Sequence, residues 1–221
     1  EDGYDGVIAV MLSSGLSGTY NLARVIAEEC RDRIPMRVFD SLSGSLGQGL
    51  TLLQLAEDLR GGMGWEELTE RRAPQLIANT FPFFSVDTLE YLQKGGRIGK
   101  VTGRAANILG IKPMILFKEG EIFSAGVARG RQKSFEKALD LLMTYLAEHN
   151  GTPDDYCITV GYGYDADEGK RLWMQTRAAL RAKYPTCECN VVLLQIGCTI
   201  AVHTGPYALG MGVMRRWKKQ G

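Results

Sequence analysis

Residues 7–20 read V-I-A-V-M-L-S-S-G-L-S-G-T-Y, a passage from an apolar run through a Ser/Gly loop into a helix. Residues 6–12 are short, apolar and rich in β-branched side chains, which predicts a strand covered on both faces. Residues 20–32 then place Leu22, Val25 and Ile26 at helical spacing, with charged residues opposite. The same order returns at residues 36–39 (strand), 40–47 (small-residue loop) and 48–59 (amphipathic helix).

This alternation predicts a parallel sheet, whose ligands collect at the carboxyl ends of the strands, where both Ser/Gly loops would lie. A further helix is expected at residues 65–79. We therefore predict a parallel α/β N-terminal domain over residues 1–79.

The texture changes after residue 80. Extended stretches are expected at residues 81–86, 113–117, 121–128, 156–163 and 189–202, separated by helices at 88–93, 131–149 and 167–183. Lys118-Glu119-Gly120 between two of these stretches is a hairpin signal. The expectation is an α/β protein of two domains, the second being mixed or antiparallel α+β over residues 80–221, with the ligand between the two.

The charge is nearly balanced: 26 Lys and Arg against 25 Asp and Glu give a net charge of +1. No long-range field therefore favours nucleic acid or an anionic membrane as the partner. No apolar run approaches the roughly 20 residues that span a bilayer, so no stable membrane insertion is expected. Five cysteines without a C-x-x-C pair suit reduced thiols, which predicts a cytoplasmic protein. An early strand so close to residue 1 suggests an upstream segment.

Residues 13–19, S-S-G-L-S-G-T, are the first candidate site. Backbone N–H groups, hydroxyls and the following helix N-terminus could form an anion cradle. A glycine-rich turn that merely caps the helix is equally compatible with this spacing. Gly15-Leu16-Ser17 also begins like the G-x-S-x-G nucleophile elbow, but Thr19 stands where that motif needs its last glycine.

Three further segments could carry chemistry. Residues 94–100, K-G-G-R-I-G-K, combine glycines with an arginine that can grip a carboxylate, although a solvated basic turn would look the same. His203 is expected at the end of an apolar strand, facing a cleft or serving the structure only. His149 is expected to complement a helix C-terminus. Arg129 and Arg131 precede a long helix, either as a phosphate or partner contact or simply as its exposed start.

Six segments must be taken together: L-S-S-G-L-S-G-T-Y (12–20), D-S-L-S-G-S-L-G-Q-G (40–49), D-T-L-E-Y-L-Q-K-G-G-R-I-G (87–99), N-I-L-G-I-K-P (107–113), the hairpin ending A-R-G (128–130) and G-C-T-I-A-V-H-T-G-P (197–206). In identity and order they resemble the DegV family of bacterial fatty-acid-binding proteins, from Tyr4 to Leu209.

This resemblance implies a two-domain α/β protein that buries a long-chain fatty acid between its domains and is not itself an enzyme. It also implies a separate ATP-using kinase subunit, which phosphorylates the presented carboxylate. By similarity, Ser17 would bond the carboxylate with Gly18 and Thr19 beside it, Arg97 and His203 would belong to the head-group region, and Arg129 would lie on the surface facing the partner. The family opens with a further α/β segment that this sequence does not show.

An apolar tunnel is expected to hold the acyl chain, with no cofactor and no metal. Its expected walls are Phe83, Phe84, Ile108, Leu109, Ile111 and Met114.

Two alternatives from other classes stay open. One is a hydrolase that uses Ser17 with His203, for which no acidic residue is obviously placed to orient the imidazole. The other is a phosphate or nucleotide binder, although both common phosphate-loop patterns are absent from the sequence.

Overall fold

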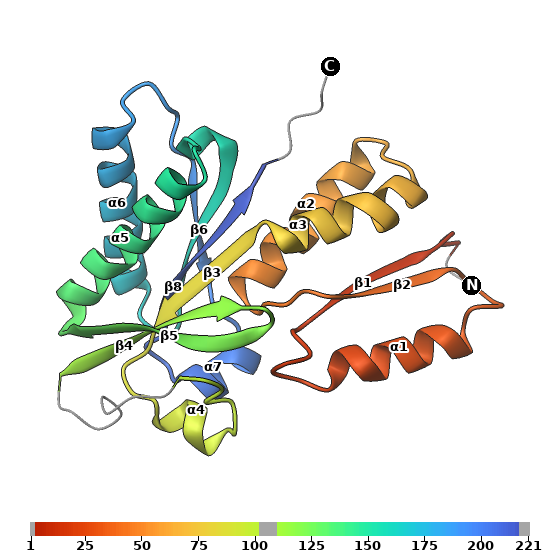
Figure 1. Cartoon of the computed structure of the whole chain (residues 1–221), viewed down its shortest axis with the longest axis horizontal. Coiled ribbons are helices and arrows are strands. Elements are labelled where there is room, and N and C mark those ends of the chain that lie inside the picture. Colours follow the sequence, from red (N-terminus) through yellow and green to blue (C-terminus); the bar gives the residue numbers. More distant parts are fainter. Residues whose placement is uncertain (1–2, 102–109, 217–221) are drawn as a thin grey trace.

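The computed structural model describes residues 3–101 and 110–216, in which the strands form two sheets (Figure 1). The smaller sheet pairs β1 (Val7–Met11) with β2 (Met36–Asp40) in parallel. The larger sheet has the order β5-β4-β3-β8-β6-β7, and within it only β6 and β7 run parallel. Its strands are β3 (Thr80–Ser85), β4 (Ile111–Lys118), β5 (Glu121–Arg129), β6 (Tyr156–Tyr162), β7 (Val191–Gln195) and β8 (Leu209–Arg215).

Helices cover both faces of the larger sheet. The helices in the described ranges are α1 (Thr19–Glu29), α2 (Leu46–Arg60), α3 (Ala73–Ala78), α4 (Glu90–Lys94), α5 (Arg131–Glu148), α6 (Ala166–Lys183) and α7 (Cys198–Thr204), with a π-helix η1 (Glu67–Arg72) before α3 and a 3₁₀ turn η2 (Pro153–Asp155) before β6. Helices α5 and α6 lie side by side on one face, while α2 contacts β3, β6 and β8 and also reaches β1 (Figure 1). The domain division that we propose at residue 80 thus separates the two sheets, with α2 in contact with both.

The predicted α/β class with a parallel first sheet and a mixed second sheet is confirmed. The predicted hairpin is also present as β4 and β5, joined by Glu119 and Gly120. Both of these residues have positive φ, of 52° and 80°. Positive φ at both central positions matches the right-handed twist of the flanking strands.

One predicted element is wrong. Residues 189–202 were expected to be extended, but β7 ends at Gln195 and residues 198–204 form α7, so His203 lies on a helix and not at a strand end. The β-branched run is overridden by its surroundings, since Ile200 packs against an apolar cluster under the larger sheet. Gly197 and Gly205, which bracket the run, were the available helix-boundary signal.

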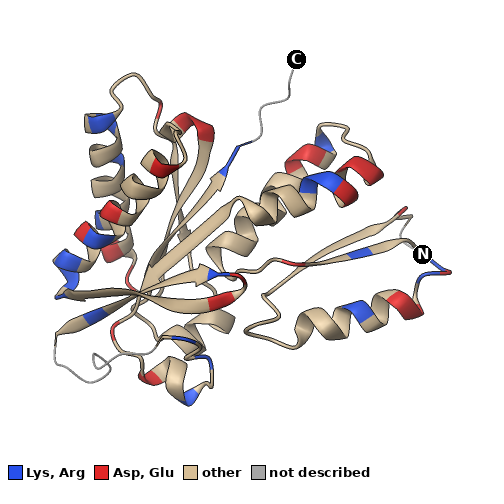
Figure 2. Ribbon diagram, viewed as in Figure 1, with Lys and Arg blue, Asp and Glu red and all other residues tan. Residues whose placement is uncertain are grey.

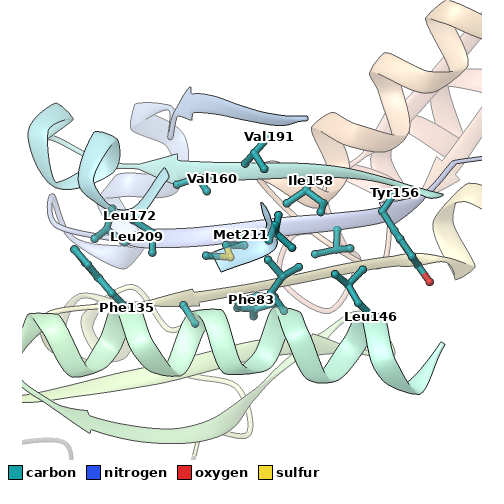
Figure 3. Close-up of a cluster of buried hydrophobic side chains, with 14 of the residues drawn as sticks. Phe83, Phe135, Leu146, Tyr156, Ile158, Val160, Leu172, Val191, Leu209 and Met211 are labelled. Carbon is teal, nitrogen blue, oxygen red and sulfur yellow. The ribbon is translucent and has the colours of Figure 1, made fainter. Parts of the chain in front are cut away.

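The main core lies between the larger sheet and the helices α5 and α6 (Figure 3). Phe83, Ile158 and Met211 from the strands meet Leu142 and Leu146 from α5, each at most 1% exposed. Tyr145 packs at the edge of this cluster and stacks on Phe81 with ring centroids 4.6 Å apart. The smaller sheet packs against this larger sheet through α2 and through the loop after β1.

Helix α1 is different, because none of its residues is buried. Leu22, Val25 and Ile26, which share one helical face, are 61%, 56% and 45% exposed. The helix therefore gains little from tertiary packing, and its contacts are with β1 and β2.

The surface charges follow no single sign. Figure 2 shows basic and acidic residues intermixed along the helices, as the near-zero net charge implies. Within residues 3–101 and 110–216, no helix has the length and apolar character that crossing a membrane requires.

The two sheets touch where the loop after β1 meets the β4–β5 hairpin. The buried Ser13 hydroxyl donates a hydrogen bond of 2.5 Å to the carbonyl oxygen of Gly120. A Cβ at Gly15 would lie 2.6 Å from that same oxygen, and one at Gly120 would lie 2.8 Å from Ser13 Oγ. Only bare backbone permits this approach, so the glycines and Ser13 together fix the first loop against the larger sheet.

We predict that Ser13→Ala lowers the free energy of unfolding by about 1–3 kcal/mol, because it leaves a buried carbonyl without its donor. The neighbouring Ser14 is exposed and its side chain forms no hydrogen bond with the described residues. Ser14→Ala is therefore the matched control, expected within about 0.5 kcal/mol of wild type. Urea unfolding measures both, and equal effects would contradict the role of Ser13.

A second prediction concerns alkaline pH. Burial raises the pKa of Tyr145 from 10.0 to about 12, with a smaller contribution from Tyr156. The unfolded chain thus releases this proton at lower pH than the folded one, so stability falls as pH rises from about 10 to 12. Tyr145→Phe should flatten this fall, whereas Tyr164→Phe, at a ring that is 76% exposed, should not. Denaturant titrations across this pH range would decide, and identical slopes for wild type and Tyr145→Phe would refute the assignment.

Candidate functional site

The loop between β1 and α1 presents Ser17 in a local turn. Ser17 Oγ lies 2.7 Å from Thr19 Oγ1 and accepts a hydrogen bond from the backbone N–H of Thr19. Gly18 is the residue before α1 and contributes no side chain. No side chain caps α1 at Gly18, so the loop is a helix start that also carries two hydroxyls, and the anion cradle stays a prediction.

The loop after α4 carries Arg97. Its Nη1 donates to the carbonyl oxygen of Gly95 at 2.7 Å and its Nε donates to that of Leu16 at 3.2 Å. Leu16 is next to Ser17 in the chain. The guanidinium of Arg97 therefore links the loop after α4 to the loop between β1 and α1. Two backbone carbonyls orient the positive charge without neutralising it.

His203 lies on α7, one residue before the helix ends at Thr204. Its Nδ1 is buried and has no hydrogen-bond partner among the described residues. The imidazole ring lies against Gly95, where an added Cβ would be 2.3 Å from Nδ1. Ser17, Arg97 and His203 are therefore linked in space through Leu16 and Gly95.

All three side chains line one cavity between the two sheets. Its volume is about 170 Å³, counted as the space that the centre of a water molecule can reach. By that measure one water needs only about 10–15 Å³, so the cavity has room for an organic group of many atoms. The other lining residues are Leu12, Leu16, Gly44, Ser45, Leu46, Pro82, Phe83, Phe84, Leu92, Phe117, Ile122, Ile196, Thr199, Ile200, Thr204, Ala208, Gly210 and Met211.

The charge on the cavity lining is positive only. Of the described residues that line it, Arg97 is the one with a permanent charge, and none is Asp or Glu. The walls are otherwise mostly aliphatic and aromatic. A molecule with a long apolar body and one anionic group matches such a lining.

The expected tunnel residues divide into three groups. Phe83 and Phe84 line the cavity. Ile111 and Met114 do not, and Met114 is packed in the main core instead. Ile108 and Leu109 lie outside the described residues.

Three other residues that the sequence singled out do not line the cavity. Gly18 and Thr19 adjoin Ser17 in the chain but are not among the lining residues, and Arg129 is exposed at the end of β5. In the described ranges, no group of three or more His, Cys, Asp and Glu side chains converges on a metal position.

Sequence reasoning missed Ser45, a second hydroxyl on the cavity wall. Ser45 precedes α2 with φ of 50° and ψ of −116°, and its side chain does not cap the helix. The signal was present, because residues 40–47 were expected to lie beside the first loop at the carboxyl end of the sheet. No pattern singled out Ser45 from the other serines of that loop.

Comparisons with known proteins identify the family of this chain. The family model described as "Uncharacterised protein, DegV family" matches residues 1–216. A DegV domain-containing protein of Clostridium acetobutylicum is 31% identical over 216 residues, which are 97% of this chain and 72% of that protein.

Two solved structures are also similar. A stearic-acid-binding protein from Eubacterium ventriosum is 36% identical with a TM-score of 0.81, over 95% of this chain and 70% of that one. A DegV family protein from Thermus thermophilus, described for its fatty-acid binding, is 30% identical with a TM-score of 0.82, over 97% of this chain and 72% of that one. The chain spans about seven tenths of these relatives, and its match to the family model covers nearly all of its own length. The chain belongs to the DegV family.

Proposed function

We propose that this chain binds a long-chain fatty acid, with the acyl chain in the cavity between the sheets and the carboxylate at Ser17, Arg97 and His203. The observation that carries the proposal is the lining itself, which is apolar apart from a few hydroxyls, one imidazole and one arginine, and has no acidic residue among the described positions. The fatty acids named for the two solved relatives support it.

The apolar walls can supply most of the affinity. Burial of about 15 methylene groups, at about 0.8 kcal/mol each, contributes about 12 kcal/mol before the costs of ordering and association. Phe84 and Phe117 offer rigid surfaces for this chain, at a small cost in side-chain entropy.

The carboxylate needs fixed partners, because an unpaired buried charge costs several kcal/mol. Arg97 is already oriented by Leu16 and Gly95, and its Nη2 donates to no described residue. The Ser17 hydroxyl and the His203 ring add donors from two other elements. Gly18 and Thr19 would act by shaping the turn that holds Ser17.

The finer part of the proposal is that the bound carboxylate is presented to a separate ATP-dependent kinase. Arg97 is exposed although it lines the cavity, which would leave the head group within reach of a partner. Arg129, also exposed, would lie on the partner surface. The chain would then be a non-catalytic subunit that works in the cytoplasm.

The geometry favours neither alternative. No hydrogen bond joins Ser17 to His203 in the described part of the chain, and no carboxylate orients the imidazole, so the arrangement lacks the links of a hydrolytic triad. A nucleotide would place polar ribose and phosphate groups against walls that are mostly apolar.

The direct test is native mass spectrometry of the purified protein, followed by denaturation and extraction of any bound molecule. A stoichiometric fatty acid, carried along or acquired from added palmitate or oleate, is the expected result. Absence of lipid in both experiments would refute binding by this chain.

Arg97→Gln should weaken palmitate binding about 10- to 100-fold, because a hydrogen bond to a charged group is worth about 1.5–3 kcal/mol. The matched control is Lys94→Gln, since Lys94 belongs to the same segment but pairs with Glu90 and is 77% exposed. Displacement of a fluorescent fatty acid gives both Kd values. The methyl ester of palmitate, which lacks the charge, should bind both variants and wild type alike, and a loss for the ester equal to that for the acid would contradict a head-group role.

A further inference from the structure

Two short helices, α4 and α7, meet beside the cavity through a reciprocal pair of glycines. The His203 ring of α7 lies against Gly95, at the end of α4. In return, the Tyr91 ring of α4 lies against Gly205, at the end of α7, where an added Cβ would be 2.7 Å from the ring. Each helix thus receives an aromatic side chain of the other in the space that a missing Cβ leaves.

The backbone conformation does not explain Gly95. It has φ of −77° and ψ of −3°, a right-handed conformation that every residue adopts easily. The helix-ending glycine with positive φ is the next one, Gly96, at 66°. Other right-handed glycines, such as Gly18 and Gly49, have open space where a Cβ would stand. Gly95 does not, because a Cβ there would be 2.3 Å from His203 Nδ1 and 3.0 Å from the Tyr91 carbonyl oxygen.

The same residue also holds the arginine. The carbonyl oxygen of Gly95 accepts the 2.7 Å hydrogen bond from Arg97 Nη1. Its bare Cα therefore faces His203 while its carbonyl faces Arg97, and both of those side chains line the cavity.

We propose that Gly95 is a positioning residue, which holds the His203 ring and the Arg97 guanidinium in place so that the two form one head-group site. This inference rests on the proposed function. In it, Gly95 contacts the protein's own histidine and arginine and does not contact the ligand. Space for the His203 ring, and not backbone freedom, is what requires glycine here. A methyl group at this position displaces the ring from the cavity wall without changing the chemistry of either side chain.

The experiment combines Gly95→Ala with His203→Ala in a double-mutant cycle. Palmitate dissociation constants are measured for wild type, both single variants and the double variant, with Gly49→Ala as the control for a glycine that has free space around it. Gly95→Ala should weaken binding about tenfold in wild type and have no further effect once His203 is replaced, because the added methyl then occupies the freed space. Gly49→Ala should leave the dissociation constant unchanged.

A second measurement does not depend on the ligand. His149 and His203 are the two histidines of the sequence, so their imidazole resonances are readily told apart by NMR spectroscopy. Gly95→Ala should shift the His203 ring resonances and leave those of His149, whose Nδ1 lies 2.8 Å from the Tyr145 carbonyl oxygen, unchanged. If wild type binds no palmitate, the proposed function fails, and this spectrum still decides whether Gly95 positions His203.

Three results would overturn the inference. One is a His203 spectrum that Gly95→Ala leaves unchanged. Another is a loss of affinity that is the same in the presence and absence of His203, which would make Gly95 independent of it. The third applies if Gly95→Ala does not fold: the double variant, which restores the space, should then fold, and its failure to do so would refute the steric argument.

Discussion

The contact between Ser13 and the Gly120 carbonyl is the constraint on which the site depends. This contact joins the loop after β1, in the smaller sheet, to the β4–β5 hairpin of the larger sheet. It is possible because Gly15 and Gly120 have no side chains. Ser17 stands four residues beyond this contact, while Phe117 and Ile122 flank the hairpin turn. This buried hydrogen bond therefore joins the two parts of the chain that both contribute residues to the cavity lining.

For the fatty acid that we propose as ligand, different elements of the fold would contact the acyl chain and the carboxylate. The strands β3 and β4, which belong to the larger sheet, contribute Phe84 and Phe117 to the apolar wall. The charged and hydrogen-bonding groups come from loops and from the short helix α7. Under the proposed function, burial of the acyl chain would rely on strands of the larger sheet, and recognition of the head group on loops and a short helix.

Sequence patterns were enough for the parallel first sheet and the hairpin, because those features follow from local periodicity and turn residues. They left the roles of Ser17, Arg97 and His203 open, and only the resemblance to the DegV family implied that these three residues lie together, as they do in the lining of one cavity. They failed for α7, since a β-branched run such as residues 199–202 has the local preference of a strand and only packing decides otherwise. They also could not separate Phe84, which lines the cavity, from Met114, which is packed in the main core. Both are apolar strand residues, and which of them reaches the cavity is set by how distant elements pack together.

The exposed apolar face of α1 has a consequence for local dynamics. A helix of 11 residues with no buried side chain has little beyond its own hydrogen bonds to hold it closed. Its backbone amides should therefore exchange with solvent long before those of α5, whose Leu142 and Leu146 are fully buried. Helix α1 begins just after Ser17, so a ligand that binds this hydroxyl would slow the exchange of amide hydrogens along the helix. The exchange rate of α1 would then indicate whether the cavity is filled.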